Sequence, residues 1–233
     1  MGNSETVSSE RNKKAFDNNV GIFAHEDYLR PEEKELTKLF KSGKILIGGI
    51  GGGRTVSSLK KLGFEIVGLD ISPKMVEACK TRFPDIDVRV GDIQRTDFAD
   101  DTFDSVFLPF HTICYVDDIQ ETLKEMKRVL KPGGTICFSM VNRWFLRDIL
   151  GGGAFRSKHV LTRFGEKHPD VMETTRGSML DVYAFRKIFP DMRVWGKVSL
   201  WEIDRYNWKD RMYRLVPFVD KSLYFFGRKP DTL

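Results

Sequence analysis

Long hydrophobic runs and clustered cysteines are both missing from this 233-residue sequence. No apolar stretch approaches the roughly 20 residues that a membrane-spanning helix needs, and the first residues are too polar for a secretory signal. The three cysteines, Cys79, Cys114 and Cys137, lack the spacing of a disulfide framework or a metal site. The four histidines show no metal-binding spacing either. These absences argue against a disulfide-stapled secreted domain and predict a cytoplasmic protein without a metal site.

A strong charge of one sign is also absent, because 38 basic and 33 acidic residues leave a net charge of only +5. Part of the excess lies between Lys187 and Lys229, where basic residues alternate with aromatic ones. A solvated face explains this pattern more simply than nucleic-acid binding, which we do not expect. The 41% of hydrophobic residues suffices for the core of one enlarged α/β domain. Nothing in the composition indicates an oligomeric state.

What the sequence does have is five glycines within six positions, directly after the aliphatic run at 45–47. A helix-compatible segment begins at Thr55, so the pattern is typical of a buried strand that turns through a glycine loop into a helix. Glycines allow positive φ and let a ligand lie on the main chain. The spacing Gly49-x-Gly51-x-Gly53 lacks the last glycine of the dinucleotide fingerprint, which argues against a nicotinamide-dependent dehydrogenase.

Strand-like and helix-like segments alternate along the chain after this loop, with short links between them. Such alternation predicts an α/β fold with a doubly wound, mostly parallel sheet, whose ligand binds beyond the carboxyl ends of the strands. The last strand is expected to close the sheet as an antiparallel pair. We expect strands near residues 44–47, 64–69, 88–90, 103–108, 135–140, 193–201 and 222–227, and helices near 32–40, 55–62, 72–82, 118–131 and 179–189.

Two aspartates occupy the ends of predicted strands. Asp70 lies 21 residues after Gly49, where a carboxylate can accept hydrogen bonds from both hydroxyls of a ribose. Asp92 follows the third strand and can accept a hydrogen bond from the exocyclic amine of an adenine, while the Ile93 N–H meets a ring nitrogen. Each aspartate could instead simply start a turn. Their common position at strand ends favours the binding roles.

Together these motifs resemble those of class I S-adenosylmethionine-dependent methyltransferases of the small-molecule type. The resemblance spans residues 36–142 and implies a seven-stranded Rossmann-like sheet with a lid insertion. The chain departs from the family at Ile47, where an acidic residue is usual. The segments that carry the resemblance are 45–53, 65–75, 91–93, 103–106 and 130–134.

The resemblance implies S-adenosyl-L-methionine as the cofactor. According to the resemblance, the glycine loop lies beside the methionine moiety of the cofactor, Asp70 holds the ribose, and Ile71 and Met75 flank the adenine. The residues expected to bind the cofactor are Gly49, Gly51, Gly53, Asp70, Ile71, Met75, Asp92, Ile93 and Leu108.

The segment 109–115, after the fourth strand, contains the candidate catalytic group. His111 titrates near neutrality and could serve as general base for a hydroxyl or ammonium acceptor. A hydrogen-bonded structural histidine is an equally good interpretation. The residues expected to contact the methyl acceptor are His111, Tyr115, Asn142, Arg143 and Trp144.

The chain divides into an N-terminal arm and helix at 1–40, a cofactor-binding core at 41–146, a polar lid at 147–178 and the rest of the same sheet at 179–233. Loops as long as 147–178 are usually functional or disordered, and we expect this segment and the N-terminal helix to form the lid together. We expect methyl transfer to an oxygen or nitrogen of a small molecule. One alternative is an RNA or protein methyltransferase, which the basic, aromatic C-terminal region suggests. Another is a non-catalytic binding or regulatory protein, which the departure at Ile47 suggests.

Overall fold

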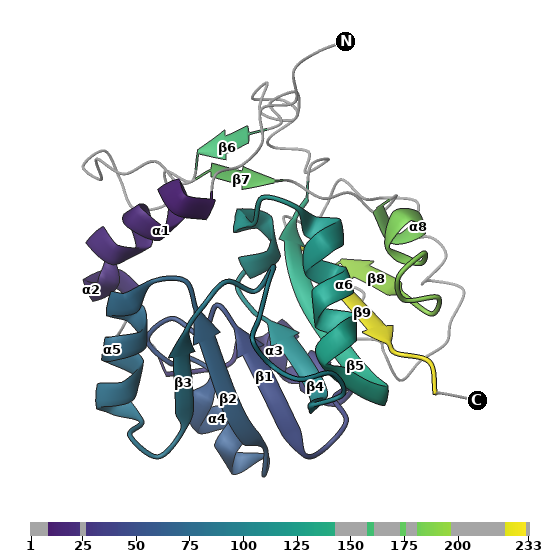
Figure 1. The fold of residues 1–233 in the computed structure, drawn as a ribbon, viewed down its shortest axis with the longest axis horizontal. Coiled ribbons are helices and arrows are strands. Elements are labelled where there is room, and N and C mark those ends of the chain that lie inside the picture. Colours follow the sequence, from purple (N-terminus) through teal and green to yellow (C-terminus); the bar gives the residue numbers. More distant parts are fainter. Residues whose placement is uncertain are drawn as a thin grey trace.

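A computed structural model describes residues 9–23, 27–142, 158–160, 173–175, 181–196 and 222–231. Its central feature is a seven-stranded sheet with the order β3-β2-β1-β4-β5-β9-β8 (Figure 1). The order reverses between β1 and β4, which is where ligands of such sheets bind. The strands are β1 (Lys44–Gly48), β2 (Glu65–Asp70), β3 (Asp87–Val90), β4 (Phe103–Leu108), β5 (Leu130–Val141), β8 (Arg193–Gly196) and β9 (Ser222–Arg228).

Strand direction confirms the predicted fold class. The pairs from β3 through β5 are parallel, whereas β9 runs antiparallel to both β5 and β8. In β1, Ile45, Leu46 and Ile47 are all fully buried. Continuous burial is expected where helices cover both faces of a parallel sheet. The fold is therefore a doubly wound, mostly parallel sheet with an antiparallel end.

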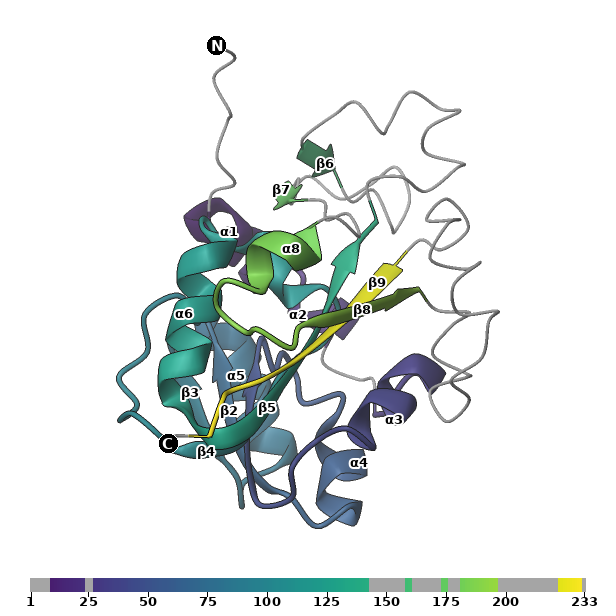
Figure 2. The same ribbon diagram turned by 90° about the vertical axis from the view of Figure 1, so that its right-hand side faces the viewer.

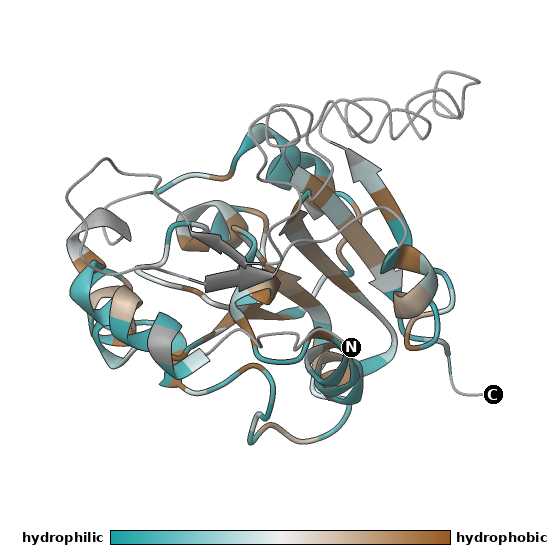
Figure 3. Ribbon diagram, turned by 90° about the horizontal axis from the view of Figure 1, so that it is seen from above, coloured by the Kyte–Doolittle hydropathy of each residue, from teal (hydrophilic) through white to brown (hydrophobic). Residues whose placement is uncertain are grey.

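Helices cover the sheet on both faces (Figure 2). On one face α3 (Pro31–Thr37), α4 (Val56–Lys61) and α5 (Pro73–Arg82) bury aliphatic residues against β1, β2 and β3. On the other, α6 (Ile119–Val129) and α8 (Asp181–Phe185) pack against β4, β5 and β9. Seen from above, hydrophobic strands lie inside and hydrophilic residues lie on the surrounding helices (Figure 3). None of the described helices combines the length and apolarity needed to cross a bilayer.

Several short elements lie at the carboxyl edge of the sheet. Helices α1 (Ser9–Asn18) and α2 (Val20–Phe23) contact α5 (Figure 1). The 3-10 helix η1 (Thr112–Tyr115) follows β4. A separate antiparallel pair, β6 (Lys158–Val160) and β7 (Glu173–Thr175), approaches η1 through β7. These elements surround the end of the sheet at which a ligand is expected.

Side-chain caps explain where two of the helices begin. The Ser72 hydroxyl accepts a hydrogen bond from the Met75 N–H, and Pro73 occupies the first position of α5. The carboxylate of Asp118 accepts from two N–H groups in the first turn of α6. Both starts agree with the predicted ones within one residue.

The largest differences from the predicted boundaries are at β5 and α8. Strand β5 begins at Leu130, not near residue 135, because Leu130 pairs with Phe103 before the register shifts. Gly133 takes a positive φ of 69° within this irregular start, so a proline-glycine stretch that reads as a helix breaker also begins the strand. Helix α8 spans only Asp181–Phe185, and turns follow it. Residues 197–201 of the predicted 193–201 strand lie outside the described residues.

Candidate functional site

The glycine loop between β1 and α4 forms one wall of the site. Gly49, Gly51 and Gly53 have φ of 65°, 55° and 87°, a region that other residues rarely adopt. A Cβ atom at Gly49 would lie 2.5 Å from the Thr112 side chain. At Gly51, by contrast, a Cβ would meet nothing within 4 Å. The loop is thus packed tightly at one glycine and leaves open space for a ligand at another.

Asp70, at the end of β2, braces this loop. Its Oδ2 accepts a hydrogen bond of 2.8 Å from the Gly51 N–H, and its Oδ1 accepts one of 2.9 Å from the Ser72 N–H. Burial raises the pKa of Asp70 to about 6, although these two hydrogen bonds oppose the shift and the nearby charge of Asp17 adds to it. Asp17 belongs to α1 and accepts a 2.5 Å hydrogen bond from the Ser72 hydroxyl. The carboxylate is therefore close to its titration range at neutral pH.

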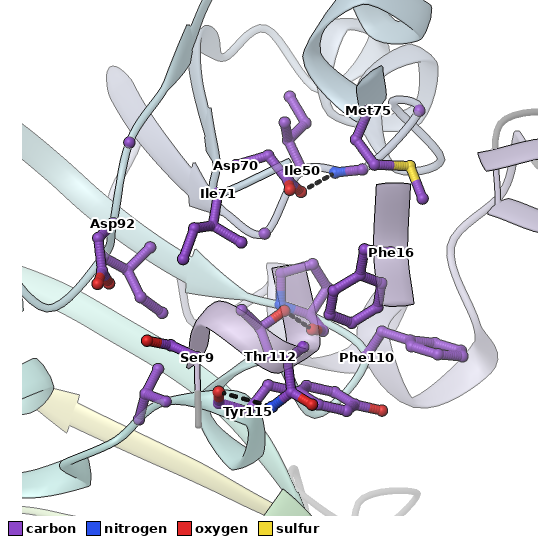
Figure 4. A pocket seen from close by; sticks show the side chains of 18 of the residues that line it. Ser9, Phe16, Ile50, Asp70, Ile71, Met75, Asp92, Phe110, Thr112 and Tyr115 are labelled. Atoms are coloured by element: carbon purple, nitrogen blue, oxygen red, sulfur yellow. Dashed lines mark hydrogen bonds between the residues drawn. The ribbon is translucent and has the colours of Figure 1, made fainter. Parts of the chain in front are cut away.

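A cavity of about 970 Å³, its open mouth included, lies between this loop, the ends of β2 and β3, and η1 (Figure 4). Asp92 and Phe110 lie on opposite sides of it in that view. Its walls combine two carboxylates, main-chain atoms and apolar side chains. Seven of the predicted cofactor residues line it: Gly49, Gly51, Asp70, Ile71, Met75, Asp92 and Ile93.

Two predicted cofactor residues do not line the cavity. A Cβ at Gly53 would lie 2.7 Å from the Phe83 ring, so this glycine serves close packing of the loop on α5. Leu108 is fully buried, and its side chain lies against Gly48 beneath the cavity. Ile47, the departure from the family pattern, is likewise fully buried among the residues that pack on α3 and α4. An acidic side chain at this position would be buried in an apolar core.

Helix α1 covers the cavity through contacts that the sequence did not predict, although an N-terminal helix was expected in the lid. Asn12 and Phe16 of this helix line the cavity. The Asn12 side-chain amide donates a 3.1 Å hydrogen bond to the Tyr115 carbonyl. The Phe16 and Tyr115 rings make an edge-to-face contact with centroids 5.2 Å apart. Ser9 binds the Asp117 carboxylate through its N–H and its hydroxyl, each at 2.8 Å. Local sequence gave no signal for these contacts, because residues 1–19 are polar and their partners lie about 100 positions away.

The predicted acceptor residues fall in different places. Tyr115 lines the cavity, and Asn142 is fully buried at the end of β5. Arg143 and Trp144 lie outside the described residues. His111 does not line the cavity; its Nε2 lies 2.9 Å from the Ser222 hydroxyl at the start of β9.

The backbone that positions His111 is unusual. Phe110 and His111 both have positive φ, 54° and 62°, although neither is glycine. Such conformations cost free energy and concentrate at functional sites. The His111 N–H donates a 3.0 Å hydrogen bond to the Ser139 hydroxyl, which helps to hold the turn. The turn directs the Phe110 side chain into the cavity and that of His111 toward β9.

A buried ion pair anchors the far end of the glycine loop. The Arg54 guanidinium donates to Glu33 Oε1 at 2.6 Å and Oε2 at 2.7 Å, and to the Tyr28 carbonyl at 2.8 Å. The two charged side chains are only 9% and 4% exposed. The pair joins the loop to α3, since Glu33 Oε2 also accepts from the Arg30 N–H. Arg54 lines the cavity with its charge already neutralised.

The cavity fits the cofactor that the resemblance implies. An ionised Asp70 offers lone pairs to ribose hydroxyls, and Ile71 and Met75 offer apolar contact to a flat ring. Asp92 offers a second carboxylate beside Ile93, so an acceptor and a main-chain N–H lie together for the edge of an adenine. The open space at Gly51 lets a chain of atoms pass the loop.

Comparison with known proteins agrees with this geometry. Residues 46–138 match the family described as a methyltransferase domain. A demethylmenaquinone methyltransferase of Renibacterium salmoninarum is 37% identical over 93 residues, which are 40% of this chain and 39% of that protein. The chain therefore matches about two fifths of the length of such curated relatives.

Solved structures resemble the chain over more of its length. One, from the complex between the Haloferax volcanii Trm112 methyltransferase activator and the putative methyltransferase, has a TM-score of 0.65 at 20% identity and covers 97% of this chain and 99% of its own. Another, Haemonchus contortus phosphoethanolamine N-methyltransferase 2 with S-adenosylhomocysteine, has a TM-score of 0.64 at 18% identity and covers 97% and 61%. At these identities the likeness shows the fold. The family match over residues 46–138, the fold and the cavity together support a class I S-adenosylmethionine-dependent methyltransferase, with S-adenosyl-L-methionine as its cofactor.

Proposed function

We propose that this chain transfers the methyl group of S-adenosylmethionine to an oxygen or nitrogen atom of a small molecule. The observation that carries the proposal is the pairing of Asp70 with the glycine loop at the wall of a cavity that also holds Asp92 and Met75. Demethylmenaquinone, the acceptor in the names of several curated relatives, is a small molecule, which supports this substrate class.

In the proposed reaction the protein mainly positions the cofactor and the acceptor and excludes water from them. When bound, the cofactor supplies an electrophilic methyl group on a sulfonium. Asp70 would hold the ribose and Asp92 the adenine, while Phe110 and η1 line another part of the same cavity. Helix α1, through Phe16, excludes water from the cavity, and alignment under these conditions can supply several kcal/mol of rate acceleration.

The lid of the enzyme consists of α1 and the segment 147–178 in this proposal. The contact of β7 with η1 supports it, since η1 lines the cavity. His111 serves on the acceptor side as the group that takes a proton from a hydroxyl or ammonium acceptor, with Ser222 orienting its ring.

The test is to titrate the protein with S-adenosylhomocysteine by calorimetry and then to measure product formation from S-adenosylmethionine with a panel of hydroxyl- and amine-bearing small molecules. We expect micromolar binding and turnover of at least one of them. His111→Gln should lower the turnover rate at least tenfold and leave the affinity for S-adenosylhomocysteine within about twofold, since general acid–base catalysis contributes roughly 10²–10⁴-fold. Turnover only with RNA or protein acceptors would replace the small-molecule assignment. Binding without any turnover would support a non-catalytic protein.

The affinity for S-adenosylhomocysteine should depend on pH through Asp70. The pKa of this carboxyl, raised to about 6 by burial, means that it is protonated below pH 6 and then accepts fewer hydrogen bonds from the ribose. We expect affinity to be constant above pH 7 and to fall about tenfold per pH unit below pH 6. Calorimetric titrations between pH 5 and 8 would show this.

In the ligand-free protein the effect of pH on folding stability is opposite to its effect on affinity: lower pH favours the fold. A carboxyl whose pKa is raised stabilises the fold fully below its ordinary value of 3.8, and this contribution is lost as pH rises through about 6.

Asp17→Asn is the matched variant for the affinity measurement, because it removes the nearby charge and keeps an oxygen for the Ser72 hydroxyl. It should move the midpoint of the affinity curve to lower pH. An affinity that is flat from pH 5 to 8 would contradict the prediction.

A further inference from the structure

The side chain of Gln94 holds the carboxylate of Asp92 at the cavity wall. Its Nε2 donates to Asp92 Oδ2 at 3.1 Å and to Oδ1 at 3.3 Å, and the Gln94 N–H donates to Oδ1 at 2.9 Å. The Gln94 Oε1 accepts a 2.9 Å hydrogen bond from the Asp118 N–H, directly before α6. Asp92 lines the cavity (Figure 4), whereas Gln94 lines a neighbouring hollow that also contains Asp92. The glutamine therefore contacts the carboxylate from outside the cavity.

Both ends of the Gln94 amide face partners of matching polarity. If the amide were turned over, its oxygen would face the Asp92 carboxylate and its N–H groups would face the Asp118 N–H, so the observed orientation is the one that satisfies both partners. A glutamate would bring a second carboxylate against Asp92, and an apolar side chain would make neither contact. The position thus calls for a side chain that donates at one end and accepts at the other.

The local turn does not need this side chain. The Arg95 N–H donates to the Asp92 carbonyl at 3.1 Å, and the Gln94 N–H meets Oδ1, so main-chain donors already close the turn. A hydrogen bond to Oδ1 alone leaves the plane of the carboxylate free to rotate, because the terminal torsion of an aspartate has a broad minimum. The contact of Nε2 with Oδ2 removes this freedom. The Gln94 side chain therefore sets the direction of the Asp92 carboxylate.

These hydrogen bonds leave part of the carboxylate available to a ligand. A carboxylate oxygen has two lone pairs, and within the part of the chain that the structure describes Asp92 Oδ2 accepts only from Gln94. The remaining lone pair suits an N–H donor such as the exocyclic amine of an adenine. The oxygen of a 6-oxo purine would instead meet this lone pair with another lone pair. A carboxylate held in one direction can thus distinguish an amino group from an oxo group.

We propose that Gln94 is a positioning residue for adenine recognition, which fixes the Asp92 carboxylate so that its Oδ2 accepts from the 6-amino group. The inference rests on the proposed function, in which Asp92 binds the adenine of S-adenosylmethionine. It adds the residue through which the site selects a 6-amino purine over a 6-oxo purine.

The experiment compares S-adenosylhomocysteine with S-inosylhomocysteine, in which an oxygen replaces the 6-amino group of the purine. Both are titrated calorimetrically into wild type, Gln94→Met and the control Gln120→Met, which makes the same change at an exposed residue of α6. We expect Gln94→Met to weaken S-adenosylhomocysteine about tenfold, as for one lost hydrogen bond to a charged group, and to leave S-inosylhomocysteine within about twofold. Gln120→Met should bind both ligands like wild type within about twofold.

A double-mutant cycle separates positioning from general support of the fold. If Gln94 acts through Asp92, adding Gln94→Met to Asp92→Ala should change the affinity for S-adenosylhomocysteine less than about twofold, because the carboxylate that it positions is gone. Equal weakening of both ligands by Gln94→Met, additive effects of the two substitutions, or wild-type affinity of Gln94→Met would each overturn the inference, while binding of S-adenosylhomocysteine by wild type would leave the proposed function in place. If wild type itself binds neither ligand, the proposed function fails and the inference fails with it.

Discussion

Asp70→Ala is expected to weaken the binding of S-adenosylhomocysteine about a hundredfold, equivalent to about 2.7 kcal/mol. The variant removes the acceptor proposed for the ribose hydroxyls, and hydrogen bonds to a charged group contribute about 1.5–3 kcal/mol each. It also leaves the Gly51 N–H without the carboxylate that fixes the glycine loop. Calorimetric titration at pH 7.5, where the wild-type carboxyl is ionised, measures the effect.

The matched control is Asp87→Ala, the same substitution on the neighbouring strand β3. Asp87 is exposed and pairs with Arg89, well away from the cavity wall. It should bind the ligand like wild type within about twofold, because surface ion pairs contribute at most about 1 kcal/mol to stability and nothing to this contact. If Asp70→Ala binds within a few-fold of wild type while Asp87→Ala is normal, Asp70 does not hold the ribose.

The sequence predicted the parts of the site that are local in the chain. Asp70 and Asp92 could be placed together because parallel strands bring their carboxyl ends to one edge of the sheet. The glycine loop was recognisable because positive φ demands a residue type that is visible in the sequence. The mostly parallel, doubly wound sheet and its antiparallel last strand followed from alternation and resemblance, and the structure confirms them.

The parts that escaped prediction depend on tertiary contacts. Helix α1 covers the cavity through Asn12 and Phe16, whose partner Tyr115 is about a hundred residues away. The orientation of His111 toward Ser222 depends on two consecutive residues with positive φ, which no residue type there indicates. Periodicity and propensity describe single elements, whereas these features arise from the way distant elements meet. Roles for the acceptor-side residues stay predictions.

The largest effect on stability should come from Glu33→Gln. This change leaves the buried Arg54 guanidinium without its counter-charge, and breaking one partner of a buried pair costs about 3–5 kcal/mol. In a chain of this size each kcal/mol lowers the melting temperature by roughly 2–4 °C, so a decrease of about 10 °C is expected. Differential scanning calorimetry of the ligand-free protein measures it.

Glu121→Gln is the control, because Glu121 forms an ion pair with Lys124 in which both side chains are more than half exposed. Exposed pairs contribute about 0–1 kcal/mol, so this variant should melt within about 3 °C of wild type. The double variant Glu33→Gln with Arg54→Met removes both charges and should recover much of the loss, since an apolar replacement of a whole buried pair is often neutral. Similar melting temperatures for Glu33→Gln and Glu121→Gln would mean that the buried pair does not stabilise the fold.

The same pair should also affect ligand binding, because it ties the glycine loop to α3 at the end opposite Asp70. Glu33→Gln loosens one anchor of the loop and leaves the carboxylate brace at Gly51 in place. We therefore expect a loss of affinity for S-adenosylhomocysteine that is smaller than that of Asp70→Ala, about tenfold, together with a larger loss of stability. If Asp70→Ala loses more affinity and Glu33→Gln loses more stability, then Asp70 holds the ligand and Glu33 holds the loop.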